Sequence, residues 1–158
     1  MTNNRPSSPP CSAHEADDAY MGFAGRDELL AALNELLEAE RAGARATLHS
    51  LKAMADPAMA ALTRRVHKDE AHWCAELARE IRRLGGTPSR RCGDFYGKVM
   101  AIAEPGARMD FLNRGQAWVV RRLDQLLPRV RDDELHAMLK RMRAGHEANI
   151  ALVASRDG

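Results

Sequence analysis

The sequence has few cysteines and lacks any long apolar run. Its three cysteines, Cys11, Cys74 and Cys92, lie far apart and form no C-x-x-C pair. This argues against a disulfide-stapled secreted domain and favours a reducing compartment. The longest apolar stretch, around residues 99–103, is too short to span a membrane, and residues 1–18 lack the apolar segment of a signal peptide. We therefore expect a cytoplasmic protein with no membrane partner.

The sequence also lacks an excess of charge of one sign and has few aromatic residues. The 24 Lys and Arg residues nearly balance 22 Asp and Glu residues, and the net charge of +2 gives no reason to expect a nucleic-acid partner. No Gly-rich phosphate loop and no nucleophile elbow is present. Aromatic residues make up 4% of the chain, and β-branched residues are few, so the composition favours helices over sheets.

Helical periodicity predicts an all-α fold with four long helices. We expect them at about residues 26–55, 57–84, 107–127 and 132–155, after a disordered tail over residues 1–24. Asp56-Pro57 leaves almost no linker between the first two helices, whereas residues 87–106 form a long connection with one short helical stretch at 95–103. Residues 25–158 are thus predicted to form one four-helix bundle with a long crossover.

The first predicted helix carries one residue that does not suit its apolar face. Steps of three and four residues give a stripe of Leu30, Leu33, Leu37, Glu40, Ala44, Thr47, Leu51 and Met54. Glu40 lies in the middle of this stripe. A carboxylate in such a place must be protonated, paired or bound to a cation, because an isolated buried charge is very costly.

Each of the other three helices has a matching interruption near its midpoint. At about 100° per residue, Glu70 lies within the apolar stripe of the second helix, Gln116 in that of the third and His146 in that of the fourth. We call Glu40, Glu70, Gln116 and His146 the waist residues. Helices of similar length packed side by side would bring all four into one layer.

Two carboxylates, an amide and an imidazole suit one iron, manganese or zinc ion. Two ions would lack ligands unless Asp69, at the edge of its stripe, or Glu147, to the side of its stripe, turns inward. The main alternative is a buried polar network that binds no metal and only stabilises the packing of a structural or protein-interaction bundle. A third and weaker alternative is a small-ligand site in the same layer.

With these residues the chain resembles the ferritin-like superfamily. Carboxylate-bridged members take a Glu from two helices and a Glu-x-x-His motif from the other two. Glu40 in LLEAERAGAR matches the lone Glu of the first helix, and Glu70 in KDEAHWC matches the Glu of the second. The resemblance covers about residues 26–155. Segments such as DEAHWC and FLNRGQAWVV are similar to those of an uncharacterised bacterial group within that superfamily.

The chain departs from the superfamily pattern in its ligands. Trp73 stands where the first His is expected, and Gln116 where the third helix would supply Glu. In GHEANI the motif alignment selects Glu147, with Ile150 in place of His, whereas the helical phase selects His146. The resemblance therefore implies a degenerate di-metal carboxylate site. Any enzymatic activity would be metal-dependent oxidation with oxygen or peroxide, and no catalytic residue is assigned.

A second apolar strip lies on the back of the third helix. Phe111, Gly115 and Trp118, which we call the aromatic strip, need cover from the crossover segment or from a second subunit. A glycine beside a large aromatic residue permits close approach of another helix. We therefore predict a homodimer through this strip.

Overall fold

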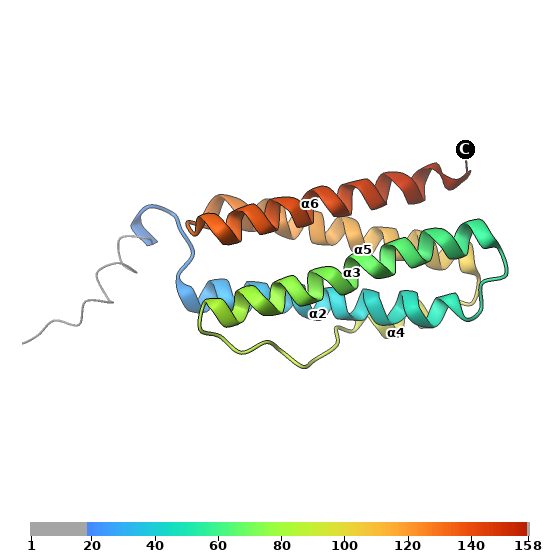
Figure 1. Cartoon of the computed structure of the whole chain (residues 1–158), viewed down its shortest axis with the longest axis horizontal. Coiled ribbons are helices and arrows are strands. Elements are labelled where there is room, and N and C mark those ends of the chain that lie inside the picture. Colours follow the sequence, from blue (N-terminus) through green and yellow to red (C-terminus); the bar gives the residue numbers. More distant parts are fainter. Residues whose placement is uncertain (1–18, 158) are drawn as a thin grey trace, which may run out of the picture.

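A computed structural model of the chain describes residues 19–157, in which four long helices lie side by side with a short fifth helix outside them (Figure 1). The helices are α2 (Arg26–Leu51), α3 (Pro57–Arg83), α4 (Phe95–Met100), α5 (Pro105–Leu126) and α6 (Asp133–Ala154). The 3-10 turns η1 (Leu127–Arg129) and η2 (Ser155–Asp157) follow α5 and α6. No strand occurs among the described residues, so the predicted all-α class is confirmed. Most of the predicted tail, residues 1–18, lies outside the described residues.

Local sequence signals set where the helices begin and end. Asp56 accepts a hydrogen bond from the Ala58 N–H and Pro57 occupies the first turn of α3, as the sequence predicts. Gly85, with φ of 81°, ends the same helix in a left-handed conformation that favours glycine. The Asp132 carboxylate caps α6 through the Leu135 N–H at 2.8 Å. Each helix end thus lies within about four residues of its predicted position.

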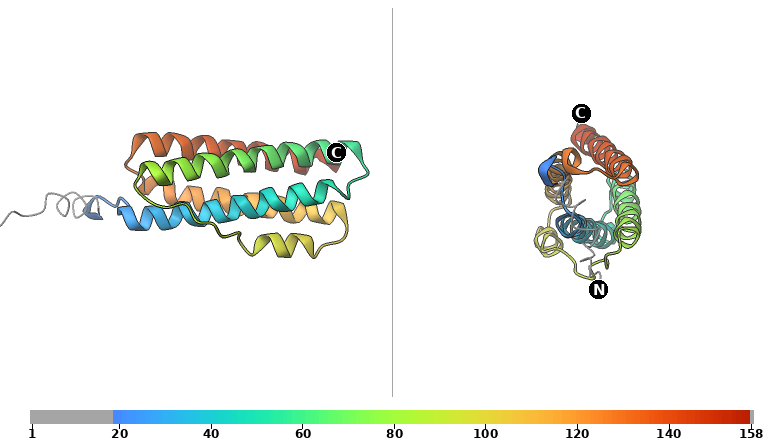
Figure 2. Two further views of the ribbon diagram at one scale, coloured as in Figure 1. Left: turned by 60° about the horizontal axis from the view of Figure 1, so that its bottom comes forward. Right: turned by 90° about the vertical axis from the view of Figure 1, so that its left-hand side faces the viewer.

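The long crossover determines the topology. α2 and α3 are antiparallel neighbours, and so are α5 and α6. Between the two pairs the chain runs back along the outside of α2, forms α4 and then enters α5, so that α3 and α5 point the same way (Figure 2). Seen end-on in Figure 2, the four long helices form a ring with α4 outside it. The predicted bundle with one long crossover is confirmed.

The core fills the space between the four long helices, and the buried face of α2 is wider than predicted. Leu33, Leu37 and Thr47 are buried as expected, but Leu30 is only half-buried and Met54 lies beyond the end of the helix. Additional buried positions on α2 are Leu29, Leu36, Ala42, Gly43, Ala46 and Ser50. This helix contacts α4 as well as α3 and α5, so a larger arc of it is covered. Within residues 19–157 no helix combines the length and apolarity that a membrane span requires.

Helix α4 covers part of the aromatic strip. The Phe95 ring stacks on Phe111 with ring centroids 5.1 Å apart. A Cβ atom added to Gly115 would lie 2.5 Å from Phe95 Cζ, so this glycine allows α4 to approach α5 closely. The sequence suggested that either the crossover segment or a second subunit covers the aromatic strip, and the structure shows that the crossover segment covers part of it. The homodimer through the same strip stays a prediction.

Candidate functional site

Each long helix contributes one waist residue to the interior of the bundle. Glu40 lies on α2, Glu70 on α3, Gln116 on α5 and His146 on α6, with exposed fractions of 2%, 5%, 2% and 1%. All four line one pocket, so the structure brings together the side chains that helical phase selected. Their chemistry therefore depends on how they pair with one another.

Glu40 and His146 form a buried pair. The His146 Nε2 atom lies 2.9 Å from Glu40 Oε1, and His146 Nδ1 lies 3.0 Å from the Met142 carbonyl oxygen. Both neighbours are acceptors, so a ring that donates to both must carry two protons. Burial by itself lowers the pKa of His146, but the charge and hydrogen bond of Glu40 outweigh it and raise the pKa above its ordinary value. The geometry and the raised pKa both favour a doubly protonated His146 ring in this pair.

Glu70 lies beside this pair in surroundings that favour its neutral acid form. Burial, followed by the negative charges of Glu40 and Asp69, raises the pKa of Glu70 well above its ordinary value, and the Thr47 hydroxyl offsets only part of the rise. A glycine makes room for this side chain, because a Cβ atom on Gly43 would lie 2.4 Å from Glu70 Oε1. Gly43 is a residue that the sequence analysis did not select. A glycine in the middle of a long helix was the available signal.

Several polar atoms of the waist residues have no hydrogen-bond partner. These buried atoms are Glu40 Oε2, Glu70 Oε2, Gln116 Oε1 and Gln116 Nε2. Buried polar atoms in native proteins are nearly always satisfied, so four unpaired atoms in one layer indicate that a ligand or water completes the site. Gln116 stands out because both ends of its amide are unpaired.

The structure resolves the alternative between His146 and Glu147. His146 faces the core, whereas the Glu147 side chain is 50% exposed and forms an ion pair with Arg143 at 3.1 Å. Glu147 is therefore not part of the waist layer, and the motif alignment that selected it was wrong by one residue. The inward face of α6 reads His146-x-x-Asn149.

Asn149 is a buried polar residue that the sequence analysis missed. It is 2% exposed, and its Nδ2 atom donates to Asp69 Oδ2 at 2.8 Å. Its side-chain oxygen accepts from Arg65 Nε at 3.4 Å. Asp69 thus points toward α6, as an inward turn would require, but it is bonded to Asn149. Asn149 lies three residues after His146, on the same face of α6, and this spacing was the signal that could have selected it.

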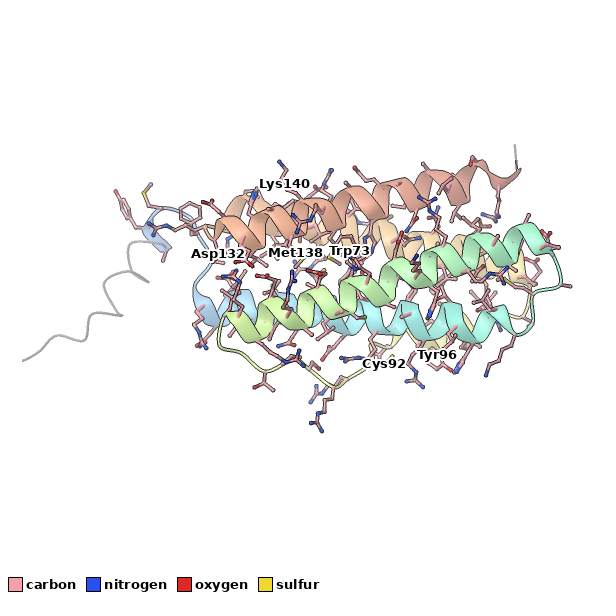
Figure 3. The ribbon with its side chains drawn as sticks, in the orientation of Figure 1. Trp73, Cys92, Tyr96, Asp132, Met138 and Lys140 are labelled. Carbon is pink, nitrogen blue, oxygen red and sulfur yellow. The ribbon has the colours of Figure 1, made fainter. Side chains whose placement is uncertain are left out.

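Trp73 stands on α3 where the resemblance to the ferritin-like superfamily leads one to expect a His. The indole is 8% exposed and lies on the side of α3 that faces α6 (Figure 3). A Cβ atom on Gly145 would lie 3.3 Å from Trp73 Cζ2, so the ring packs against the α6 backbone. Its Nε1 atom is buried without a hydrogen-bond partner. The Trp73 ring is thus a packing residue that offers no metal ligand.

This donor set does not fit a di-metal centre. Only two Glu carboxylates and one imidazole are present, and the positions that would supply further ligands hold Trp73, Gln116 and Asn149. Among residues 19–157, no group of three His, Cys, Asp or Glu side chains already has the arrangement of a metal site. A single ion remains compatible in chemistry, because Glu40, Glu70 and Gln116 each offer an unpaired oxygen.

A pocket of about 530 Å³ connects the waist residues to the surface. Buried residues of α2, α3, α5 and α6 form its floor, including all four waist residues. Its walls come from Ala39 and Gly43 on α2, Phe95 on α4, and Phe111 and Trp118 on α5. The pocket has the size and the mainly apolar lining of small-molecule sites in proteins.

Comparisons with known proteins agree with this fold. A family model described as a domain of unknown function, DUF6306, matches residues 27–155. A similar solved structure is titled as the crystal structure of ferritin-like, diiron-carboxylate proteins from Bacillus anthracis str. Ames. It is 18% identical, with a TM-score of 0.74 over 82% of this chain and 94% of that one. No curated protein matches. The chain therefore belongs to the DUF6306 family and has a ferritin-like fold.

Proposed function

We propose that this ferritin-like bundle binds one divalent transition-metal ion, iron, manganese or zinc, at the waist residues. Glu40, Glu70 and His146 would hold the ion, with the Gln116 amide oxygen as a further donor. The observation that supports this proposal is the set of unpaired buried oxygens on three different helices. Carboxylate oxygens and one imidazole match the ligand preferences of these metals.

Metal binding at this site must release protons. The pKa values of Glu70 and His146 are both raised above their ordinary values, which favours the protonated form of each group in the absence of an ion. A metal ligand must be deprotonated, so the Glu40–His146 bond has to open and Glu70 has to lose its proton. We therefore expect affinity to rise with pH. A bound iron or manganese ion would supply oxidation chemistry with oxygen or peroxide, and a zinc ion would act as a Lewis acid.

Metal analysis of protein purified without a histidine tag tests this proposal. We expect about one metal ion per chain at saturation, by titration with Fe²⁺, Mn²⁺ and Zn²⁺ followed by elemental analysis. Glu40→Gln and Glu70→Gln should each lower affinity at least tenfold. Glu80→Gln is the matched control, because Glu80 is also buried on α3 but does not line the pocket. Equal metal binding in all variants, or none in the parent protein, would contradict the proposal.

The second candidate is a structural or protein-interaction bundle that binds no metal. The direct bond between Glu40 and His146 favours it, because the two groups neutralise each other without an ion. On this interpretation, added metal leaves the melting temperature unchanged and the waist residues serve only to specify how the helices pack. The same titration, followed by thermal unfolding, separates the two candidates.

A further inference from the structure

The pocket that the waist residues line carries an inference about the metal-free protein, in which the Gln116 amide is available to an organic ligand. We propose that it binds a small organic acid with an apolar middle and a neutral hydrogen-bonding group at its far end. The carboxylate lies at the mouth between Lys98, Arg114 and Arg121, and the far end reaches Gln116.

The depth of the lining residues gives the direction of the ligand. Lys98, Arg114 and Arg121 line the pocket and are exposed, so they form its mouth; we call them the rim cations. Gln116 and Val119 are buried and lie at its floor. A ligand that fills the pocket therefore passes from a charged opening to a neutral amide.

The charges at the mouth favour an anion. Glu35 is already paired with Arg122 at 2.8 Å, and Glu38 accepts a hydrogen bond from Ser89 at 2.5 Å. Lys98 and Arg121 form no ion pair with any described residue. Asp94, which also lines the pocket, is exposed and likewise forms no ion pair with a described residue. Glu38 keeps its negative charge, because a hydroxyl group does not neutralise it, so the three cations face two carboxylates without an ion pair among the described residues, and the remaining positive charge favours a carboxylate ligand.

The walls and floor determine the rest of the ligand. Phe95 stacks on Phe111 at one side of the pocket, and Arg114 lies over the Phe111 ring, 5.2 Å from its centroid. These rings and Trp118 offer an apolar surface of the kind that binds an aromatic or aliphatic body. At the floor, the Gln116 amide is 2% exposed and has both its donor and its acceptor unpaired. A hydroxyl group can satisfy both, whereas a second carboxylate would face Glu40 and Glu70.

Calorimetric titration of the full chain in EDTA tests this proposal separately from metal binding. The probe is 6-(4-hydroxyphenyl)hexanoate, compared with the alcohol and the amine that replace its carboxylate and with 6-phenylhexanoate, which lacks the hydroxyl group. We expect the acid to bind at least tenfold more tightly than the alcohol, the amine to bind least, and loss of the hydroxyl group to weaken binding about fivefold. Trp118 fluorescence should change on binding, because the indole lines the pocket.

Charge-reversal variants locate the site. Lys98→Glu with Arg121→Glu should lower affinity for the acid at least tenfold. Arg64→Glu with Lys68→Glu makes the same charge change at exposed α3 positions outside the pocket and should alter affinity less than twofold. Ala39→Phe should block binding by filling the pocket, whereas Ala31→Phe, exposed on the same helix, should not. Equal affinity for acid, alcohol and amine, no binding of the acid, or equal effects of both charge reversals would overturn the proposal.

Discussion

Among residues 19–157, buried carboxylates occur at two places, and their surroundings differ. At the end of the bundle, Glu80 on α3 is fully buried, and its Oε2 atom lies 2.7 Å from Arg83 Nη2. The same guanidinium reaches Asp132, which lies at the start of α6 in Figure 3, at 2.6 Å. At the waist, Glu40 is paired with His146, and Glu70 has no cationic partner in the described part of the chain.

The difference lies in what neutralises the carboxylate. Arg83 is 32% exposed and permanently charged, so the cation at the bundle end persists over the whole physiological pH range. The waist depends on an imidazole and on a proton held by Glu70, both of which a metal ion or a change of pH can displace. One buried oxygen of Glu80 is also unpaired, so unpaired atoms alone do not mark a site. The waist differs because its neutralising groups are exchangeable.

Breaking the Glu40–His146 pair should have the largest effect on stability. His146→Ala leaves a buried carboxylate without its cation, and we expect it to lower the free energy of unfolding by about 3–5 kcal/mol. Arg83→Ala, the equivalent change at the bundle end, should cost less, about 1.5–3 kcal/mol, because the Arg83 side chain is 32% exposed and its removal gives water a route to Glu80. Urea unfolding at pH 7 measures both.

A double variant checks the cause. Glu40→Leu with His146→Leu removes both charges and should recover most of the stability lost in His146→Ala. If the double variant is less stable than the single one, burial of an unpaired charge is not the reason for the loss.

Gly43→Ala should have the next largest effect. The new methyl group would lie 2.4 Å from Glu70 Oε1, and moving that side chain should cost about 1–3 kcal/mol, although alanine favours helix. Gly97→Ala on α4 is the control, because no heavy atom lies within 4 Å of its Cβ position; it should stabilise the protein by up to about 1 kcal/mol. Thermal unfolding compares the two, and equal shifts would show that Glu70 does not need this space.

The pH dependence of stability should show the smallest effect. Because the pKa of Glu70 is raised on folding, the folded protein retains a proton that the unfolded chain loses above about pH 4.5. Stability therefore falls as pH rises from 4.5 toward the folded pKa. The raised pKa of His146 acts in the same direction above about pH 6.5.

Glu70→Gln removes one of these two contributions. We expect its stability to decline less steeply than that of the parent protein between pH 5 and about 8, measured by urea unfolding at several pH values. Identical slopes for the two proteins would mean that Glu70 is ionised in the folded state.

The sequence predicted most of the fold and part of the site. Asp56-Pro57 and Gly85 placed the ends of α3 because capping is a local interaction. Glu40 and His146 were selected because a polar residue on an apolar stripe is visible from helical phase alone. Asn149 was missed because its burial depends on Asp69, which reaches it from another helix.

Amino-acid order alone determined the four long helices, their short and long connections, and the one polar residue at the middle of each. Each of these follows from residues within a few positions of one another. Only the tertiary structure decided that His146 bonds Glu40, that Gly43 makes room for Glu70, and that Phe95 covers Gly115. Those contacts depend on the rotation and height of one helix against another, which are set by side-chain packing across the interface and not by the period of a single helix.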